Sequence, residues 1–454
     1  MVPKIVLLDG AFRPHYYREL RAQLQAEWLV PDEPQHVLCS GVRPDLVLLS
    51  DEYHNEVSVA ASAMMRQGVP VLHIVDGVVE WRNTWENPRS RSADRGMPLF
   101  QPILSHKIAC IGRSQARIFE SWGNLGRCEV VGVTRFDQLL GRKPRVRAAG
   151  APIEILVMTA KTAGFTPEQL SQAENSLRDL KNWFDAHSQI GETQLKPRWR
   201  ISSELDQQIG VTSQLGDTTG QELAAVLSEV DAVISTPSTA VLEAMLQGVP
   251  TALLDYNNCP HYIPAAWTIT APRHFGQVLP ELVNPPQEKQ LYQDTLLHDA
   301  LECRTAATPR LVRLAEEMIR IGRESRARGR SLQFPRRILH DPQDGHHLPE
   351  ERFDLSQFYP EHLIFARMDR AALQAELGHL HFDLKRLQAK FERYQQRRVL
   401  MADVLEQYGL LRPIIQRMRR FRRMWAQGRS SHTTQQRASN RRCDRLAARS
   451  NSEL

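Results

Sequence analysis

The chain alternates short runs of apolar residues with stretches in which apolar residues recur every three or four positions. In the first third, apolar runs that predict buried strands cover residues 4–9, 45–50, 71–75, 107–112 and 129–133. Between them, segments such as 16–26 and 56–66 have the spacing of amphipathic helices. Strands that alternate with helices predict a parallel sheet with helices on both faces.

A second unit repeats this pattern after a linker predicted at 141–152. Its predicted strands cover residues 154–158, 199–202, 232–235 and 251–254. Thr166, Pro167 and Gln169 predict the start of a long helix through Phe184, and helices are also predicted at 222–228 and from Thr308-Pro309 to Ile319. The fold class that follows is α/β, with two tandem doubly wound, Rossmann-like domains at 1–145 and 146–329. Ligands of such sheets bind at the carboxyl ends of the strands, so we expect the site in the cleft between the domains.

The pattern changes after residue 329. Residues 330–360 predict a linker, and residues 361–429 predict a helical extension. In that extension, apolar residues alternate spacings of four and three at Leu373, Leu377, Leu380, Leu384, Leu387, Phe391 and Tyr394. This heptad pattern predicts a coiled coil and therefore a homodimer. The alternative is an amphipathic helix that packs on its own domain.

Charge is distributed unevenly along the chain. The net charge is +6, but residues 412–449 contain twelve arginines and one acid, and Glu453 follows them, so the residues before Arg412 sum to −4. Among the arginines of 412–423, one helix face carries Ile414, Ile415, Met418, Phe421 and Trp425. A basic helix with an apolar face is typical of binding to an anionic membrane surface. Nucleic acid is the less favoured partner, because phosphate binding has no use for the apolar face; packing on the protein's own domain is the other alternative.

Composition restricts the remaining possibilities. No run of 18 apolar residues occurs, so we expect a cytoplasmic protein, peripheral on the inner face of the plasma membrane if the basic helix binds there. The Ser-, Arg- and Gln-rich residues 430–454 predict a disordered tail. The six cysteines lack metal-ligand spacing and predict buried free thiols in a reducing compartment.

The stretch STPSTAVLEAMLQGVP, residues 235–250, follows one of the predicted strands and begins a short helix. Ser235, Thr236 and Pro237 form the turn, and Ser238 fits the N-cap position. The N–H groups of the first helical turn then point into the cleft with the positive end of the helix, which predicts a phosphate site. The alternative for Ser238 is simple capping of the helix.

Two further side chains of this helix extend the predicted site. The hydroxyl of Thr239, like that of Ser238, adds a donor for the phosphate. Glu243 lies one turn beyond Thr239 on the same face, where its carboxylate can accept hydrogen bonds from the diol of a ribose. The alternative for Glu243 is a solvent-exposed helix residue. A phosphate beside a diol describes half of a nucleotide.

These residues carry a family resemblance. The run DAVISTPSTAVLEAMLQGVPTALLD resembles the nucleotide-binding segment of GT-B glycosyltransferases and their relatives, the UDP-N-acetylglucosamine 2-epimerases and the polyol-phosphate transferases. CEVVGVTRFDQL is similar to the segment that ends the first domain in several of these families. The resemblance implies that Ser238 and Thr239 meet the donor phosphates, and that Glu243 meets the ribose. Ser235 and Thr236, in the turn before them, are further candidates for binding the donor. It also implies metal-independent chemistry without a cofactor, and no Asp-x-Asp cluster occurs in the chain.

The sequence departs from the family pattern at two points. Retaining enzymes of the commonest type have a second Glu eight residues before the ribose-binding one, where this chain has Ser235, and the glycine-rich turn of the epimerases is absent. Both departures favour an inverting transferase or a polyol-phosphate transferase. An inverting transfer needs a general base beside the acceptor hydroxyl.

The loop of residues 76–86 is the best candidate for that base and for acceptor binding, since it follows a predicted strand and is long. We expect Asp76 to be the base, with Glu80 as an alternative in the same loop. Trp81, Arg82 and Trp85 are the candidate acceptor-binding residues, because tryptophans stack on sugar faces. Asp76 could instead simply form a turn with Gly77.

Two residues at other strand ends complete the candidates. His15, in the loop after the first predicted strand, is the rival base, although it could be an exposed histidine at a helix start. Lys161 follows the strand predicted at 154–158 and could hold a donor phosphate, or could equally face solvent.

The function expected from these features is transfer of a sugar from a nucleotide-sugar donor to a lipid-linked or polymer acceptor in cell-surface polysaccharide synthesis. The alternatives are polyol-phosphate transfer and a non-catalytic scaffold of the same fold.

Overall fold

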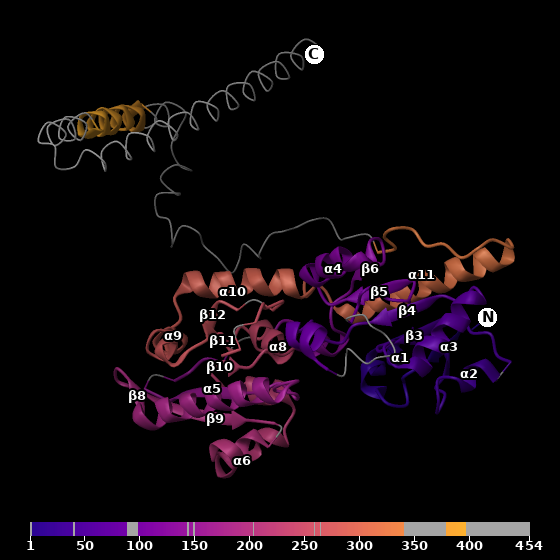
Figure 1. The fold of residues 1–454 in the computed structure, drawn as a ribbon, viewed down its shortest axis with the longest axis horizontal. Helices are drawn as coiled ribbons and strands as arrows, with labels where there is room; N and C mark the ends of the chain where they lie inside the picture. Colours follow the sequence, from indigo (N-terminus) through magenta and orange to yellow (C-terminus); the bar gives the residue numbers. More distant parts are fainter. Residues whose placement is uncertain are drawn as a thin grey trace, which may run out of the picture. The chain divides into compact units, whose positions relative to one another are not determined.

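A computed structural model describes residues 2–39, 41–88, 99–142, 145–148, 150–202, 204–257, 259–263, 265–339 and 378–395. The chain divides into two compact units, Met1–Phe353 and Asp354–Leu454. The first unit holds two sheets, and Figure 1 labels most of their strands and helices. Among the described residues, no helix is both long enough and apolar enough to span a membrane.

The first sheet has six parallel strands in the order β2-β1-β3-β4-β5-β6. The strands are β1 (Lys4–Leu7), β2 (Glu27–Leu29), β3 (Leu46–Leu49), β4 (Val71–Ile74), β5 (Lys107–Cys110) and β6 (Cys128–Val130). The helices among them are α1 (Arg18–Gln23), α2 (His36–Cys39), α3 (Asn55–Arg66) and α4 (Arg113–Phe119). The sheet confirms the five predicted strands. It also contains the edge strand β2, which the sequence analysis did not predict because its three residues form too short an apolar run.

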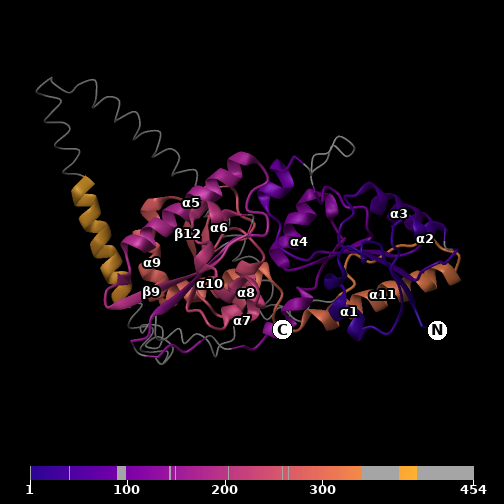
Figure 2. The same cartoon turned by 90° about the horizontal axis from the view of Figure 1, so that it is seen from below.

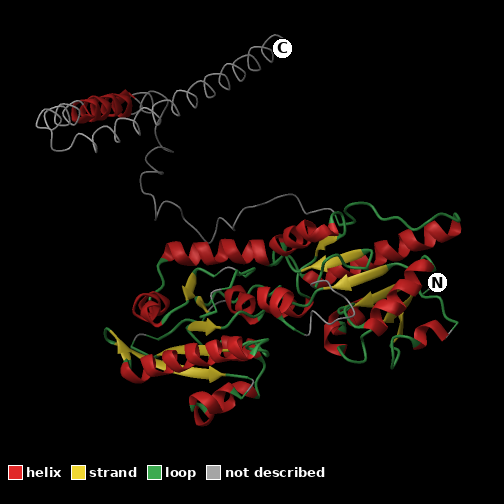
Figure 3. Ribbon diagram, viewed as in Figure 1, coloured by secondary structure: helices red, strands yellow, loops and turns green. Residues whose placement is uncertain are grey.

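Successive residues of the central strands enter two different apolar clusters. Ile5 and Leu7 pack with residues of α1, whereas Val6 packs with residues of α3 on the opposite face. This alternation follows from the pleat of a strand, and it shows why a strand covered on both faces is apolar throughout. Figure 3 shows helices on either side of the strands.

The second sheet has the order β12-β11-β10-β7-β9-β8. Its strands are β7 (Ile153–Met158), β8 (Gln189–Ile190), β9 (Thr193–Arg200), β10 (Ala232–Ser235), β11 (Thr251–Leu254) and β12 (Trp267–Ile269). Its helices are α5 (Pro167–Ala186), α6 (Leu205–Ile209), α7 (Leu223–Leu227), α8 (Ala240–Leu246), α9 (Phe275–Val283) and α10 (Gln287–Ala300). The pair β8–β9 is antiparallel, and the other strands pair in parallel.

The predicted start of α5 is confirmed in detail. Thr166 is the N-cap residue, and its hydroxyl accepts a 3.3 Å hydrogen bond from the N–H of Gln169. Pro167 occupies the first turn, where its missing N–H has no cost. The amphipathic helix predicted at 16–26 is shorter, because a 3-10 turn precedes α1 at Arg18.

The last helix, α11 (Ala307–Ala327), lies within the second predicted domain, 146–329, but packs on the first sheet. Its apolar residues, including Leu311 and Met318, pack in the cluster of Ile5 and Leu46 on the first sheet. Figure 2 shows α11 beside α1. The helix predicted to start at Thr308-Pro309 starts one residue earlier, at Ala307, with Ala306 as its N-cap. The Asp137 carboxylate accepts the N–H groups of Ala307 and Thr308, at 2.6 and 2.8 Å.

Residues 330–339, predicted to begin a linker, are attached to the first sheet. The Lys107 side chain is fully buried and donates to Glu129 at 2.7 Å, and to the carbonyls of Pro335 and Arg336. Glu129 in turn accepts the N–H groups of Ile338 and Leu339, at 2.8 and 3.0 Å. The segment supplies the partners that this buried ion pair requires.

In the second unit the structure describes a helix at 378–395, which confirms helix for that part of the predicted coiled coil. Leu373 and Leu377, the basic segment 413–425 and the tail 430–454 lie outside the described residues. The prediction of buried thiols holds for Cys110 and Cys128 and is wrong for Cys39, which is exposed.

Candidate functional site

Both sheets reverse their strand order at a point where a ligand site is expected. In the first sheet the order reverses between β1 and β3, and in the second between β7 and β10. Such reversals leave a crevice outside the carboxyl ends of the two strands. The candidate residues after β7 and β10 therefore lie where the topology favours binding.

An apolar cluster joins the two sheets beside this crevice. Val241, Leu242 and Met245 of α8 pack with Phe119 of α4 and Phe136. These three residues form the buried face of α8, and much of what covers it comes from the first sheet's half of the unit. The start of α8 is thereby held against the loop that follows β4.

Ser235 and Thr236 are buried and serve the turn itself. Ser235 Oγ donates to the carbonyl of Thr236 at 2.8 Å, and Thr236 Oγ1 accepts from the N–H of Ala160 at 2.8 Å. These bonds tie the loop after β10 to the loop after β7. Lys161, predicted to hold a phosphate, follows in that second loop and is exposed.

Thr239 contacts the first sheet's loop. Its Oγ1 accepts a 3.1 Å hydrogen bond from the N–H of Val78, and a β-carbon on Gly77 would overlap that oxygen. The N-cap prediction for Ser238 is wrong by one residue, because Thr239 is the N-cap and makes no side-chain cap bond. Ser238 is half-buried and lies 3.5 Å from the Ser235 hydroxyl.

Glu243 is paired with an arginine from the first half of the unit. Arg135 Nη2 lies 3.4 Å from Glu243 Oε1, and Arg135 Nη1 donates to the backbone carbonyl of Asp76 at 2.7 Å. Burial raises the pKa of Glu243, while Arg135 and Arg200 oppose that rise. Glu243 is therefore no solvent-exposed helix residue: its side chain is 15% exposed, in a crevice with two cations.

Arg135 is one residue of the site that the sequence analysis did not predict, although it lies in the segment GVTRFD that carries part of the resemblance. The neighbours of Arg135 in that segment have structural roles. Gly132 has a φ of 100° and approaches the carbonyl of Glu302 so closely that a β-carbon would clash. Phe136 is in the core, and the Asp137 carboxylate caps α11. The Arg135 side chain is 33% exposed and faces the crevice.

Asp76 and His15, the preferred base and its rival, line one pocket. Its other walls include Tyr16, Gly132 and Arg135. Burial, and then the charge and hydrogen bonding of the Asp76 carboxylate, raise the pKa of Tyr16 to about 12. The phenol thus stays protonated near neutral pH and donates to Asp76, while His15 is exposed at the pocket rim.

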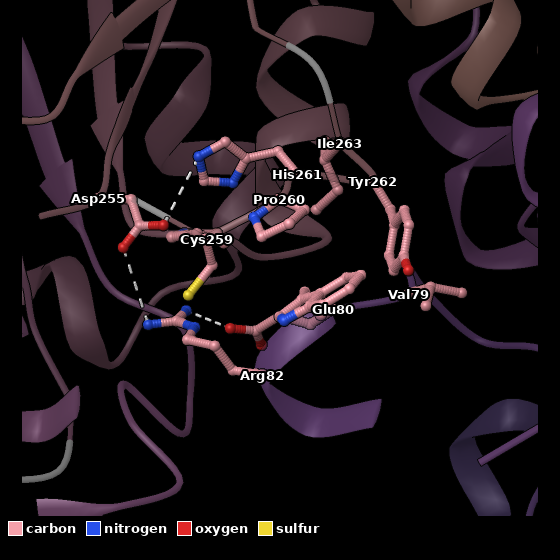
Figure 4. Close-up of a pocket in the computed structure, with 11 residues that line it drawn as sticks. Val79, Glu80, Arg82, Asp255, Cys259, Pro260, His261, Tyr262 and Ile263 are labelled. Carbon is pink, nitrogen blue, oxygen red and sulfur yellow. Dashed lines mark hydrogen bonds and ion pairs between the residues drawn. The ribbon is translucent and has the colours of Figure 1, made fainter. Parts of the chain in front are cut away.

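Glu80 and Arg82 face a second pocket, lined also by residues that follow β11 (Figure 4). Arg82, predicted to bind acceptor, is 2% exposed and pairs with Glu80; its Nη1 lies 3.9 Å from Asp255 Oδ1. The pKa of Glu80 is raised to about 7. Burial is the main cause and the charge of Asp255 adds to it, while Arg82 opposes the rise. His261 Nε2 lies 3.6 Å from Asp255 Oδ2.

Sequence reasoning did not single out Asp255 or His261. A signal existed, because TALLD ends a buried strand in an acid in the same way as KIVLLD. Asp255 is 3% exposed, and its Oδ2 makes no hydrogen bond with the part of the chain that the structure describes. The second pocket therefore gathers two carboxylates around one buried guanidinium.

The two tryptophans of the loop belong to an aromatic cluster. The rings of Trp81 and Trp85 lie 5.6 Å apart, and Trp85 also contacts Trp122 at 5.6 Å. Trp85 Nε1 donates to the Tyr262 hydroxyl at 3.2 Å. Within the described residues, no group of three or more His, Cys, Asp or Glu side chains is placed to hold a metal ion.

No family model matches the sequence, and no curated protein matches it. Among solved structures, a putative UDP-N-acetylglucosamine 2-epimerase from Listeria monocytogenes is 13% identical, covering 70% of this chain and 96% of that one, with a TM-score of 0.47. The wall teichoic acid polymerase TagF is 10% identical, with 70% and 89% covered and a TM-score of 0.44. The calicheamicin glycosyltransferase CalG4 is 14% identical, with 72% and 100% covered and a TM-score of 0.43.

These similarities fall within the families that the sequence resembles. At such identities and TM-scores, they carry no conclusion about the activity of this chain.

Proposed function

We propose that this protein is a metal-independent, inverting glycosyltransferase that uses a nucleotide-sugar donor. The observation that carries the proposal is the bridge made by Arg135 between Glu243 of α8 and the backbone of Asp76. The bridge joins a largely buried carboxylate to the residue that carries the candidate base, beyond the carboxyl ends of strands from both sheets, and Arg200 is a second cation that acts on Glu243. A diphosphate with a ribose needs this combination of charges.

The donor side consists of Glu243, Arg135 and Arg200. The Glu243 carboxylate accepts hydrogen bonds from the ribose diol. Arg135 is one-third exposed and its contact with Glu243 is long, at 3.4 Å, so exchanging that contact for one with a phosphate costs little. Arg200, at the end of β9, adds a second positive charge, which also acts on Glu243. Cations at this place stabilise the charge that develops on a departing diphosphate.

The acceptor side is the pocket of Asp76, Tyr16 and His15. The Asp76 carboxylate takes the proton of the acceptor hydroxyl as the hydroxyl oxygen attacks the anomeric carbon. The bond from that carbon to the diphosphate breaks, and the nucleoside diphosphate leaves with its electron pair. We propose a lipid-linked or polymer acceptor, and an anionic membrane surface as the place of work, because of the basic segment 412–425.

A nucleotide panel read by melting temperature tests the donor site. One nucleoside diphosphate is expected to stabilise the full chain, by about 2.7 kcal/mol at a hundred times its dissociation constant. Glu243→Gln should remove this stabilisation and leave the melting temperature of the free protein nearly unchanged. Glu317→Gln, at an exposed ion pair on α11, is the matched control.

The panel also separates the alternatives. Stabilisation by CDP-glycerol, and by no nucleotide-sugar, would assign polyol-phosphate transfer. A protein that no nucleotide stabilises would be a scaffold, and the proposal would fail.

A further inference from the structure

The helix at 378–395 exposes an apolar stripe. Its five large apolar side chains with this spacing are more than half exposed: Leu380 (53%), Leu384 (54%), Leu387 (62%), Phe391 (61%) and Tyr394 (65%). They alternate spacings of four and three, so they lie on one helix face. An exposed stripe of this spacing is the seam of a coiled coil, which is stable only when a second helix covers it.

The residues beside the seam specify the direction of that second helix. In a heptad a–g, Leu384 and Phe391 take position a, so the g positions are Asp383 and Lys390. The e positions carry His381, Gln388 and Gln395. The e and g side chains flank the seam and determine partner choice and orientation.

The two orientations place different residues opposite each other. In a parallel pair, g faces e of the other helix, so Asp383 would face Gln388 and no opposite charges would meet. In an antiparallel pair, g faces g, so Asp383 faces Lys390 of the partner subunit, twice in each dimer. The sequence repeats the two signs seven residues outward, at Glu376 and Arg397, which lie outside the described residues.

We propose that the helix 378–395 pairs with the same helix of a second copy of this chain in antiparallel orientation. Leu384 then packs against Leu387 of the partner subunit, and Leu380 packs against Phe391 of the partner subunit. This pairing is independent of the proposed enzymatic function, because none of its residues belongs to the crevice between the two sheets.

The first test is the mass of the full-length protein, measured by light scattering over a range of concentrations. The wild type should be a dimer, and Leu384→Asp with Leu387→Asp should be a monomer with an unchanged melting temperature of the first unit. Lys385→Ala, one residue outside the seam, is the control and should remain dimeric. A monomeric wild type, or a dimer that survives the double substitution, would overturn the pairing.

The second test is a charge exchange that reports orientation. Asp383→Lys alone places two lysines opposite each other in the antiparallel pair, and Lys390→Asp alone places two aspartates there. Each variant should dimerise about tenfold more weakly, which is about 1.4 kcal/mol. Mixing the two variants should restore wild-type affinity in a mixed dimer, as should both changes in one chain.

A parallel pair would respond differently, because each exchanged residue would face a neutral glutamine. Single variants that dimerise as well as the wild type, or a mixture that restores nothing, would overturn the antiparallel orientation.

Discussion

The backbone N–H of Val78 donates a 3.1 Å hydrogen bond to the hydroxyl of Thr239, which lies 161 positions further along the chain. The bond joins the loop after β4 to the start of α8. It holds Asp76 and Glu243 on opposite sides of Arg135, which contacts both. The width of the candidate crevice therefore depends on how closely Gly77 approaches Thr239.

Gly77→Ala should widen the crevice, because its β-carbon would overlap the Thr239 hydroxyl oxygen. We expect a loss of about 1–3 kcal/mol in the free energy of unfolding, as for other overpacked contacts, and loss of stabilisation by nucleotide. Urea unfolding and the nucleotide panel measure the two effects.

Gly77→Ala combined with Thr239→Ala is the control for this steric reason. Removing the hydroxyl makes room for the new methyl group. The double variant should therefore lose less free energy of unfolding than the two single variants lose together. Strictly additive losses would show that the overlap is not the cause.

Asp76→Asn should keep nucleotide binding and lower turnover by roughly 10²–10⁴-fold, the usual effect of losing a general base. The amide has nearly the same shape but cannot take the acceptor proton. The measurement is turnover with the donor that the panel identifies. The variants His15→Gln and Glu80→Gln are measured in the same way and compared with Asp76→Asn. Full activity in Asp76→Asn, with a loss in one of the other two variants, would assign the base to that residue.

The buried Glu80 should make the protein less stable as the pH rises from about 4.5 to 7. Its pKa is about 7 in the folded protein, so in this range the folded state keeps a proton that the unfolded state has released. The contribution of Glu80 to stability is complete below the unfolded pKa and is lost as the pH rises through 7, by at most about 1.4 kcal/mol per pH unit.

Urea unfolding at pH 5 and pH 7.5 measures this slope. Glu80→Gln should flatten it relative to the wild type, whereas Glu317→Gln, in an exposed pair, should not. Equal slopes in the wild type and Glu80→Gln would contradict the shifted pKa.

Truncation after Gly329 should destabilise the first unit, and truncation after Leu339 should not. The shorter chain loses the carbonyls of Pro335 and Arg336 that Lys107 contacts, and two N–H groups that Glu129 accepts. Hydrogen bonds to charged groups are worth about 1.5–3 kcal/mol each, so the loss should exceed about 3 kcal/mol. The urea midpoint of the two truncated proteins is the measurement, and equal midpoints would return residues 330–339 to the predicted linker.

The order of strands and helices was largely determined by the sequence, because local side chains control it. Buried parallel strands are covered on both faces, so KIVLLD, EILVM and AVIS could be recognised from their apolar residues alone. Thr166 and Pro167 likewise begin α5 through contacts within four residues. For the same reason, the sequence could place Asp76 just after a strand and Glu243 in the helix that follows another strand.

The tertiary structure alone decided which distant residues meet. The apolar spacing of α11 shows that one of its faces is buried, but not that β1 and β3 cover that face. Arg135 meets Glu243, 108 residues away along the chain, only because α8 packs on the first half of the unit. Periodicity specifies which side of an element avoids water, whereas the partner that covers it depends on packing over the whole unit.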